Sequence, residues 1–493
     1  MPQATEIELK FQVPAASAAA VRRAVATAAV QRTRLQAVYF DTADVRLAAA
    51  GLALRLRREG DRWVQTLKGR GDDLMNRLEH EVVLAPGGSE PPVDPARHAG
   101  SPAGQALAAA LQGAELLPQY RTDILRLHRV VRQGGIRIEI AFDEGRILAA
   151  DRSWPVCELE FELKAGSPTA LIDLATRWAL RHGLWLDVRT KSERGHRLAR
   201  GMEVVPAVKA AALPASAMLD RHGCFNAMLL STLAHALPNA AEIAGGSGTP
   251  EHLHQLRVGL RRLRTALRLF AGWSADPAGA IELEAGWRPS FQQLGQARDV
   301  DAVDAAFGPA LAAAGAPPKP ASAPTATSDD PGALLRDPRF TQQVLATLRL
   351  IQVAAPPWQP SEPELRVAAA QVLRKAWRAV QRDAQGFAQA TVEVQHRLRR
   401  RLKRLRYACE FLQPLFPGRP AGRALKAMRV ALEALGGWND MQVARGLCQA
   451  RHGDAHDWFA LGWLAARQPA QLDRCVEALE ALDRAPRFWR ERR

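Results

Sequence analysis

Glu6-Ile7-Glu8-Leu9-Lys10 is the stretch that decides the fold of the first part of this chain. Polar and apolar residues alternate here, so a β-strand would place Glu6, Glu8 and Lys10 on one face. Burying two carboxylates and an ammonium is costly unless they have partners. A half-exposed edge strand is the simpler interpretation of these five residues alone. The other is a divalent cation held by the acids and a phosphate held by the lysine.

Five further segments show the same alternation, each with acids or bases on one face and Ile, Leu, Val or Phe on the other. They are Leu52–Arg57, Trp63–Lys68, Arg77–Val82, Ile136–Asp143 and Cys157–Lys164. Helices expected at 15–29 and 168–182 would cover the apolar faces. The charged faces then line the bore of a closed antiparallel barrel. A bore that mixes acids and bases is sensible if metal ions pair the acids and phosphate oxygens pair the bases.

The connections between these strands are also predicted from turn residues. Glu59-Gly60-Asp61 and Glu144-Gly145 are expected to be turns, and the Pro-, Gly- and Ser-rich residues 86–104 a loop. Strands are further expected at 33–40 and around 120–131.

Taken in order, these motifs resemble the CYTH domain of the triphosphate tunnel metalloenzymes. The matching motifs are Glu6-x-Glu8-x-Lys10, Leu54–Arg57, Thr66–Gly69, Arg77–Glu81, Phe142–Gly145, Glu158–Glu162 and Lys191–Gly195, within residues 3–201. The resemblance implies an eight-stranded tunnel that binds triphosphate with bases and divalent metal with acids. Its members hydrolyse inorganic triphosphate, thiamine triphosphate or RNA 5′-triphosphates, and one branch makes cyclic AMP.

The resemblance also implies roles for individual residues. It assigns catalysis to Lys10, Glu8 and Glu81, metal binding to Glu6, Glu8, Asp143, Glu158 and Glu160, and substrate binding to Lys10, Arg55, Arg57, Lys68, Arg77, Arg126 and Lys191. Around 120–131, Arg126 fits the family spacing better than Arg121. Oxygen ligands of this kind suit Mg²⁺ or Mn²⁺.

After a linker predicted at 202–216, helical periodicity replaces alternation, and an internal repeat appears. His254-Gln-Leu-Arg257-Val-Gly-Leu-Arg261-Arg262-Leu-Arg264 matches His396-Arg-Leu-Arg399-Arg-Arg-Leu-Lys403-Arg404-Leu-Arg406. Further on in each copy, Leu294-Gly295 through Asp299 matches Leu435-Gly436 through Asp440. The repeat predicts an all-α domain of two duplicated halves with pseudo-twofold symmetry, 217–310 and 333–493, joined by a flexible Ala/Pro-rich loop at 311–332.

Each repeated helix carries two stripes. On the first helix, His254, Arg257, Arg261, Arg264 and Arg268 share one face, and on the second helix His396, Arg399, Lys403 and Arg406 do. The predicted core stripes are Leu256, Leu260, Leu263, Leu267 and Phe270 in one copy and Leu398, Leu402, Leu405, Cys409 and Leu412 in the other. Cations four residues apart repel, and no acid in the stripe offsets them. Simple solvation is one explanation; an anion bound between the halves is the other.

The paired helices are similar to the CHAD domain, a conserved-histidine α-helical domain often found behind a CYTH domain. The resemblance covers about 217–490 and implies binding of inorganic polyphosphate by eight residues of the two basic stripes, all of those named above except Arg268. The alternative interpretation is that His254 and His396 cap or pack their helices; metal binding by them has no supporting acid or cysteine cluster.

Composition limits the remaining choices. The net charge of +16, concentrated in the second half, favours an anionic partner for that half. Five scattered cysteines without zinc spacing or a secretory signal favour a reducing cytosol. No apolar run is long enough to span a membrane. We therefore expect a soluble cytoplasmic protein, with polyphosphate granules as a further location.

The leading hypothesis is a metal-dependent inorganic triphosphatase at 1–201 joined to a polyphosphate-binding domain at 217–493. The rival is a non-catalytic polyphosphate-binding or granule-associated protein. The tunnel acids favour the enzyme, because anion capture needs only bases. Nucleic acid binding is disfavoured, because no aromatic platform accompanies the basic stripes. The sequence leaves open the preferred triphosphate, the choice of metal and the oligomeric state.

Overall fold

The computed structural model divides the chain into two units. It describes residues 5–71, 74–84, 89–218, 220–296, 307–318, 330–354, 362–416, 418–450 and 454–490. The barrel unit comprises Met1–Lys209, Leu233–Leu256 and Pro331–Gln352, and the helical unit comprises Ala210–Thr232, Arg257–Asp330 and Val353–Arg493. Each unit is described by itself.

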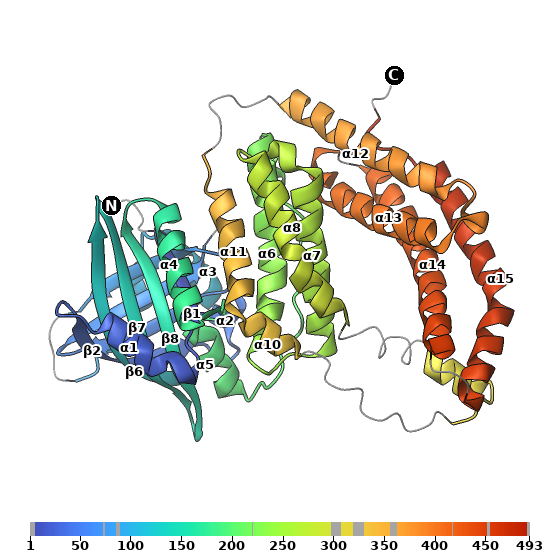
Figure 1. Cartoon of the computed structure of the whole chain (residues 1–493). Coiled ribbons are helices and arrows are strands. Elements are labelled where there is room, and N and C mark those ends of the chain that lie inside the picture. The colour runs from blue at the N-terminus through green and yellow to red at the C-terminus, as the bar shows by residue number, and fades with distance from the viewer. Residues whose placement is uncertain are drawn as a thin grey trace. The chain divides into compact units, whose positions relative to one another are not determined.

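Eight antiparallel strands of the barrel unit close into a ring (Figure 1). They are β1 (Thr5–Gln12), β2 (Gln31–Asp41), β3 (Ala53–Glu59), β4 (Arg62–Arg70), β5 (Asn76–Val83), β6 (Leu117–Gln133), β7 (Ile136–Ala149) and β8 (Arg152–Ala165). Their order is β5-β4-β3-β2-β6-β7-β8-β1, and pairing of β1 with β5 closes the ring. The short β9 (Trp185–Leu186) adds to β1. The predicted closed barrel is confirmed.

Helices cover the apolar outer face of the strands. Phe11, Phe142 and Phe161 are fully buried on that face. Phe161 meets Trp178 of α4 (Pro168–His182) edge-on, with ring centroids 5.9 Å apart. The other predicted helix, α1 (Ala15–Val25), packs on β6 and β7 and ends four residues earlier than expected. Because both helices lie outside, the alternate side chains of each strand point into the bore.

The connection predicted as a loop at 86–104 is partly helical. Residues Pro95–His98 form a 3₁₀ helix (η1), and α3 (Pro102–Leu111) begins inside the predicted loop. The Ser101 hydroxyl accepts a hydrogen bond from the Gly104 N–H, and Pro102 takes the first helical position. This N-cap followed by proline is a helix-start signal that the loop composition hid. The helix covers Leu47, the single buried residue of α2 (Arg46–Ala49), together with neighbouring leucines of β3 and β4.

The predicted turn at Glu144-Gly145 is wrong. Strand β7 runs straight through both residues, and Gly145 pairs with Ile124 of β6. A Cβ on Gly145 would lie 2.0 Å from the Asp123 carbonyl oxygen. The glycine therefore permits a close approach of two strands inside the sheet, and the turn that joins β6 to β7 falls at Gly134-Gly135, which both have positive φ.

Replacing Gly145 with alanine should destabilise the barrel unit by about 2–3 kcal/mol, because the added methyl group must push two backbones apart. Chemical denaturation followed by circular dichroism measures this. Gly422→Ala is the control: Gly422 has open space around its Cβ position in the long helix α14 (Arg419–Ala450). That change should stabilise its helix by about 0.5–1 kcal/mol. A Gly145→Ala protein as stable as wild type would contradict the close approach.

Helix α5 (Lys191–Arg200) packs against β6, β7 and β8 of the barrel. A capping box fixes its first turn: the Thr190 hydroxyl accepts from the Glu193 N–H, and the Glu193 carboxylate accepts from the Thr190 N–H. The cap sets where Lys191 and Arg194 project.

Segments from the region predicted to be purely helical also belong to the barrel unit. They are the second half of α6 (Arg221–Ala244), the start of α7 (Pro250–Leu269), α10 (Pro331–Arg336) and α11 (Pro338–Ile351). The Thr341 hydroxyl of α11 accepts from the Leu186 N–H at 3.2 Å. Buried Glu242 of α6 accepts two hydrogen bonds from Arg197 at 2.6 and 2.8 Å. The boundaries 1–201, 202–216 and 217–493 stay a prediction, and these contacts make the full chain the proper material for experiments.

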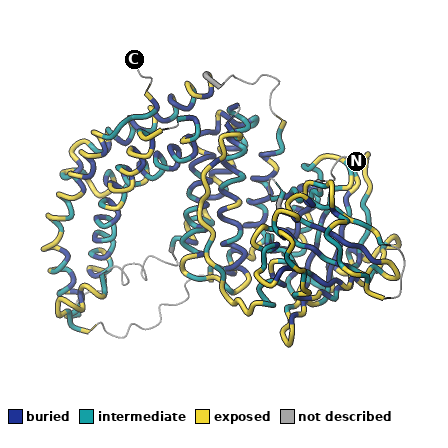
Figure 2. Tube along the Cα trace, turned by 180° about the vertical axis from the view of Figure 1, so that it is seen from behind, coloured by how far each residue is buried: buried dark blue, intermediate teal, exposed yellow. Residues whose placement is uncertain are grey.

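The helical unit contains the rest of α7 with α8 (Pro277–Gln296), α12 (Glu362–Ala384), α13 (Val392–Leu412), α14 and α15 (Ala455–Arg484). Successive helices from α12 to α15 pack on one another (Figure 1). Both predicted core stripes are buried, which confirms the helical phase inferred from the repeat. Figure 2 shows buried and exposed residues alternating along the helices.

The loop predicted at 311–332 is shorter at both ends than expected. Residues 307–313 are helical, and Leu311 packs with Cys448 and Ala460. At the other end, α10 begins at Pro331. Residues 319–329, like Asp299 of the repeat, lie outside the described residues.

Candidate functional site

The structure brings the predicted tunnel residues together in the bore. They come from β1 (Glu6, Glu8, Lys10), β3 (Arg55, Arg57), β4 (Lys68), β5 (Arg77, Glu81), β6 (Arg126), β7 (Asp143), β8 (Glu158, Glu160) and α5 (Lys191). Ion pairs between strands that are not neighbours in the ring show that these side chains meet inside it. Lys68 of β4 reaches Glu6 of β1 at 2.9 Å, for example.

Lys191 lies at the centre of the most buried cluster. Its Nζ is 2.8 Å from Asp143, 2.7 Å from Glu158 and 2.6 Å from Glu160. Arg126 binds two of the same carboxylates, at 2.7 Å from Asp143 and 2.5 Å from Glu160. Three carboxylates thus converge on one ammonium, in a place where none of them is more than 16% exposed.

Lys10 and Arg194 complete this cluster around Glu158. The Lys10 ammonium donates to the Arg189 carbonyl and lies 3.8 Å from Glu158, while Arg194 donates directly to the Glu158 carboxylate. Burial alone would raise the pKa of Glu158, but Lys10, Lys191 and Arg194 outweigh it and lower the pKa to about 2. Burial lowers the pKa of Lys10, and Glu158 opposes that shift. Glu158 is therefore the anion that holds the surrounding cations in place.

A second cluster joins β1 to β4 and β5. Lys68 lies 2.9 Å from Glu6 and 3.1 Å from Glu79, and Arg77 lies 2.9 Å from Glu8. Burial raises the pKa of Glu6, although Lys68 lowers it. Burial would lower the pKa of Lys68, but Glu6 and Glu79 raise it above its ordinary value.

A third cluster surrounds Arg57. Its guanidinium contacts Glu59 and lies 3.3 Å from Glu81. Burial would raise the pKa of Glu81, but Arg57 and Arg55 lower it, so this carboxylate is ionised at neutral pH. Arg55 donates to the Tyr39 hydroxyl at 3.2 Å.

Some residues of these clusters were missed from the sequence. They are Glu79, Glu59, Tyr39, Arg189 and Arg194. Glu79 shares the alternation of its strand with Arg77 and Glu81, so the signal was present. Glu59 was assigned to a turn although it continues the alternation of Arg55 and Arg57. Arg194 follows Lys191 by one helical turn, which places both on the same face of α5.

The bore fits a hard divalent cation in its chemistry. Within the described ranges, no three acid, histidine or cysteine side chains are placed so that they could hold a metal ion as they stand. The carboxylates Asp143, Glu158 and Glu160 instead converge on the Lys191 ammonium, which shows that they can surround a positive charge. Their oxygens suit Mg²⁺ or Mn²⁺ better than zinc. A metal ion held by all three would require Lys191 to move.

Replacing Glu158 with glutamine should lower the melting temperature at pH 7, because three buried cations lose their counter-charge. The deficit should shrink as the pH falls from about 4.5 towards 2, because wild-type Glu158 then also becomes neutral. The sign follows from its pKa, which is lower in the folded chain than the ordinary value. Thermal melts across this pH range measure it.

Glu162 provides the control for that experiment, since it lies on the same face of β8 and pairs with Lys164 at 2.5 Å. Burial raises its pKa, so Glu162→Gln should show no deficit that closes at low pH. Identical pH profiles for the two variants would contradict the special role of Glu158.

In the helical unit, the two basic stripes approach each other. Lys403 of α13 lies within electrostatic reach of Arg261 of α7 and of Arg399 and Arg406 on its own helix. Burial first, and these cations next, lower the pKa of Lys403 to about 6, with Asp440 of α14 opposing them. Within the described part of the unit, no carboxylate comes within 4.0 Å of Arg261, Arg399 or Lys403.

The expectation that no acid offsets the stripes is wrong for two of their residues, Arg264 and Arg406. Arg264 lies 2.7 Å from Glu284 of α8, and Arg406 lies 2.9 Å from Glu410 one turn along α13. These acids were missed because Glu284 comes from another helix and Glu410 lies beyond the repeated motif. The remaining imbalance is at the centre, around Arg261, Arg399 and Lys403.

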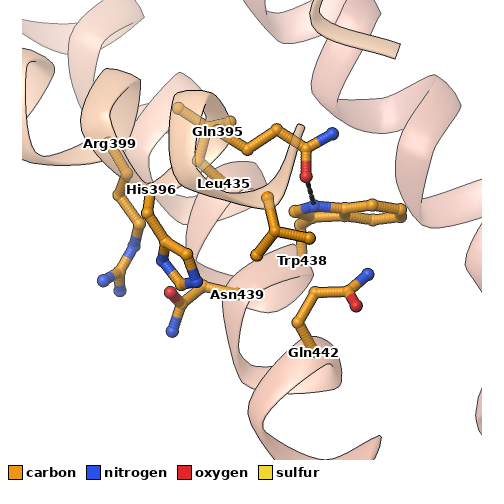
Figure 3. Close-up of a pocket in the computed structure, with 8 residues that line it drawn as sticks. Gln395, His396, Arg399, Leu435, Trp438, Asn439 and Gln442 are labelled. Atoms are coloured by element: carbon orange, nitrogen blue, oxygen red, sulfur yellow. Dashed lines mark hydrogen bonds between the residues drawn. The ribbon is translucent and has the colours of Figure 1, made fainter. Parts of the chain in front are cut away.

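His396 and Arg399 line a small pocket with Leu435, Trp438 and Asn439 (Figure 3). Figure 3 shows His396 next to Asn439, with Arg399 on the same side of the pocket. The Trp438 indole donates to the Gln395 side chain at 2.8 Å, which fixes the pocket wall. Next to it, Gly436 lies beside the Arg399 guanidinium, as Gly295 lies beside that of Arg257 in the first half. His254 lies in the part of α7 that belongs to the barrel unit.

Comparisons with known proteins agree with this architecture. Residues 4–196 match the family model of the CYTH domain, and residues 227–449 match that of the CHAD domain. The chain is therefore a fusion of a CYTH domain and a CHAD domain.

Individual relatives are similar to one or the other part. An inorganic triphosphatase from Haemophilus influenzae is 31% identical over 163 residues, which is 32% of this chain and 44% of that protein. The CHAD domain from the plant Ricinus communis is 30% identical and covers 57% of this chain and 99% of its own, with a TM-score of 0.47. A Hippeastrum protein with a dominant triphosphatase activity is 17% identical and covers 41% of this chain and 98% of its own, with a TM-score of 0.28.

Among the helices that the structure describes, none is both long enough and apolar enough to cross a membrane.

Proposed function

We propose that the barrel hydrolyses inorganic triphosphate, or a related triphosphate, with Mg²⁺ or Mn²⁺. The observation that carries the proposal is the bore itself, where buried carboxylates and buried cations are intermixed in three clusters. A triphosphate with its metal ion could take over both sets of partners, because phosphate oxygens pair the cations and the metal pairs the acids. The similarity to an inorganic triphosphatase supports the same activity.

The charged residues of the bore would have two roles, phosphate binding and metal binding. Arg55, Arg57, Lys68, Arg77, Arg126 and Lys191 would hold the phosphate oxygens and spread the charge of the transition state. Glu6, Glu8, Asp143, Glu158 and Glu160 would hold the metal ion. When bound, the metal ion neutralises phosphate charge and makes bound water more acidic.

Three residues would act closest to the reaction. Glu81 is kept ionised by Arg57 and Arg55, so its carboxylate can accept a proton from the attacking water. Lys10 brings a buried ammonium towards the phosphate oxygens, and Glu8 is positioned by Arg77 at 2.9 Å.

The rival function is a tunnel that only binds a phosphate chain. The carboxylates argue against it, because capture of an anion is weakened by buried acids. Activity assays separate the two.

Lys68→Ala in the full chain should reduce the rate of phosphate release from triphosphate by about 100-fold or more, because one cation to the substrate is lost. Glu8→Gln should do the same by weakening the metal site. Excess EDTA should abolish the activity, and Mg²⁺ or Mn²⁺ should restore it. A phosphate-release assay on inorganic, thiamine and nucleoside triphosphates measures these effects and ranks the substrates.

The control is Arg34→Ala on the outside of the barrel, where Arg34 pairs with Asp123 at 2.6 Å and is 67% exposed. It should keep wild-type activity. Equal rates for Lys68→Ala and wild type, or unchanged turnover in excess chelator, would remove the tunnel as the active site.

We also propose that the helical unit binds inorganic polyphosphate along its two basic stripes, at Arg257, Arg261 and Arg264 with His396, Arg399, Lys403 and Arg406. The like charges of Arg261 and Lys403 lie near each other, and Lys403 has its pKa lowered to about 6, so a polyanion would relieve their repulsion. Cations spaced about 5–6 Å apart along a helix suit a repeating chain of phosphates.

Reversing Arg257, Arg261, Arg399 and Lys403 to glutamate should reduce polyphosphate affinity by at least about 1000-fold, since each contact contributes about 1.5–3 kcal/mol. Wild-type affinity should fall steeply with salt, as for other polyanions. Isothermal titration at several salt concentrations measures both effects.

The matched control reverses four exposed cations of the same unit, Arg423, Lys426, Arg429 and Arg474. It changes the net charge equally but should cost far less affinity. Equal losses from both sets would mean that only net charge matters, and the stripes would no longer be a binding site.

A further inference from the structure

The carbonyl group that holds Lys10 belongs to the short loop 187–190 between β9 and α5. The Lys10 ammonium donates to the Arg189 carbonyl oxygen, and the Lys10 carbonyl accepts from the Asp187 N–H at 3.4 Å. Lys10, Asp187 and Arg189 are all buried. The direction in which Lys10 points therefore depends on where this loop places the Arg189 carbonyl.

The Asp187 carboxylate folds the loop. It accepts from the Arg189 backbone N–H at 2.9 Å and from the Arg189 guanidinium at 3.0 and 2.9 Å. The Gln12 side chain of β1 donates to the same carboxylate at 3.1 Å. Because Asp187 binds both the backbone and the side chain of Arg189, a shift of the guanidinium would also move the carbonyl that Lys10 uses.

The other side of the Arg189 guanidinium meets the end of α6. The Glu242 carboxylate of α6 lies 3.9 Å from Nη1 of Arg189, and this buried Nη1 makes no hydrogen bond to any residue that the structure describes. Gly245 follows α6 directly, and a Cβ there would lie 2.5 Å from both Nη atoms. The guanidinium is thus confined between Asp187 and the end of α6.

Glu242 is itself fixed in place. Arg197 of α5 donates to it at 2.6 and 2.8 Å, and the Ser247 hydroxyl donates to it at 2.7 Å. Burial would raise the pKa of Glu242, but Arg197, Ser247 and Arg189 outweigh burial and lower it, so this carboxylate is ionised at neutral pH. A fixed negative charge therefore faces Arg189 from α6.

We propose that Glu242 and Gly245 position Lys10 in the bore, acting through the guanidinium and the carbonyl of Arg189. Glu242 is a positioning residue, because it acts on Lys10 only through Arg189. Both residues lie outside 4–196, which matches the CYTH domain, and inside 227–449, which matches the CHAD domain. The tunnel site therefore includes a segment of the second domain. The inference rests on the role proposed above for Lys10 in binding phosphate oxygens.

The first test is Glu242→Gln in the full chain, which removes the charge opposite Arg189 and keeps the size of the side chain. Affinity for inorganic triphosphate should fall about tenfold, because Lys10 loses its fixed position and one charged hydrogen bond to the ligand weakens. Isothermal titration in EDTA measures the affinity without metal-dependent turnover. Gly245→Ala keeps every charge and should lower the affinity in the same direction, because its methyl group displaces the guanidinium.

A double-mutant cycle with Lys10→Met separates positioning from a general structural effect. Lys10→Met alone should weaken triphosphate binding about tenfold or more. Adding Glu242→Gln to Lys10→Met should weaken it no further, because the side chain through which Glu242 acts is gone. A purely structural role of Glu242 would lower the affinity equally with and without Lys10. If Glu242→Gln does not fold, Gly245→Ala takes its place in the same cycle.

Asp173→Asn is the matched control. Asp173 of α4 lies 3.0 Å from Arg349 of α11, so this ion pair also joins the barrel to a later segment of the chain, but it is largely exposed and does not involve Arg189. The control should bind triphosphate as wild type does.

Two results would overturn the inference alone. One is an equal effect of Glu242→Gln with and without Lys10, and the other is wild-type affinity in both Glu242→Gln and Gly245→Ala while Lys10→Met binds weakly. A Lys10→Met protein that binds triphosphate as tightly as wild type would instead remove the proposed role of Lys10, and the inference with it.

Discussion

Charge balance in the bore is the constraint on which the barrel depends. A closed ring of strands has no edge, so its inward side chains share a confined space with little water to solvate them. Isolated ions there would unfold the domain, and the chain avoids this by placing each acid against a base from another strand or from α5. Lys191 illustrates the solution, since one ammonium balances Asp143, Glu158 and Glu160. Removing any one charge therefore leaves its partner ion buried without a counter-charge, which is destabilising.

The closure of the barrel was predictable because alternation reports the two faces of every strand, and only an inward charged face explains so many strands at once. The sequence misled at Gly145. Glycine is typical of turns, but here it lies in the middle of a strand and allows two backbones to approach closely. Local composition cannot distinguish these two uses, because the partner strand that needs the space is distant in sequence. Arg194 was missed for a related reason: its role depends on the capped first turn of α5, not on strand alternation.

In the helical unit, the periodicity of leucines fixed the buried face correctly, since that face depends only on spacing along one helix. The spacing along one helix could not predict which acids reach the basic stripes from other helices. Glu284 reaches Arg264 from α8, and Asp440 faces Lys403 from α14. The sequence therefore predicts which cations share a face, while the tertiary fold decides which of them stay uncompensated. The same holds for Glu242, whose pairing with Arg197 joins part of α6 to the barrel unit.

The nearness of the equivalent residues Arg261 and Lys403 has a consequence for how this unit can vary. In a dimer of identical chains, a side chain on the axis always meets its own copy, so one substitution alters both sides together. A single chain that carries both copies has no such restriction. Arginine opposes lysine at one pair of equivalent positions, and arginine replaces glutamate at another, Arg268 and Glu410. Joining two copies in one chain thus permits an asymmetric charge pattern on a duplicated scaffold.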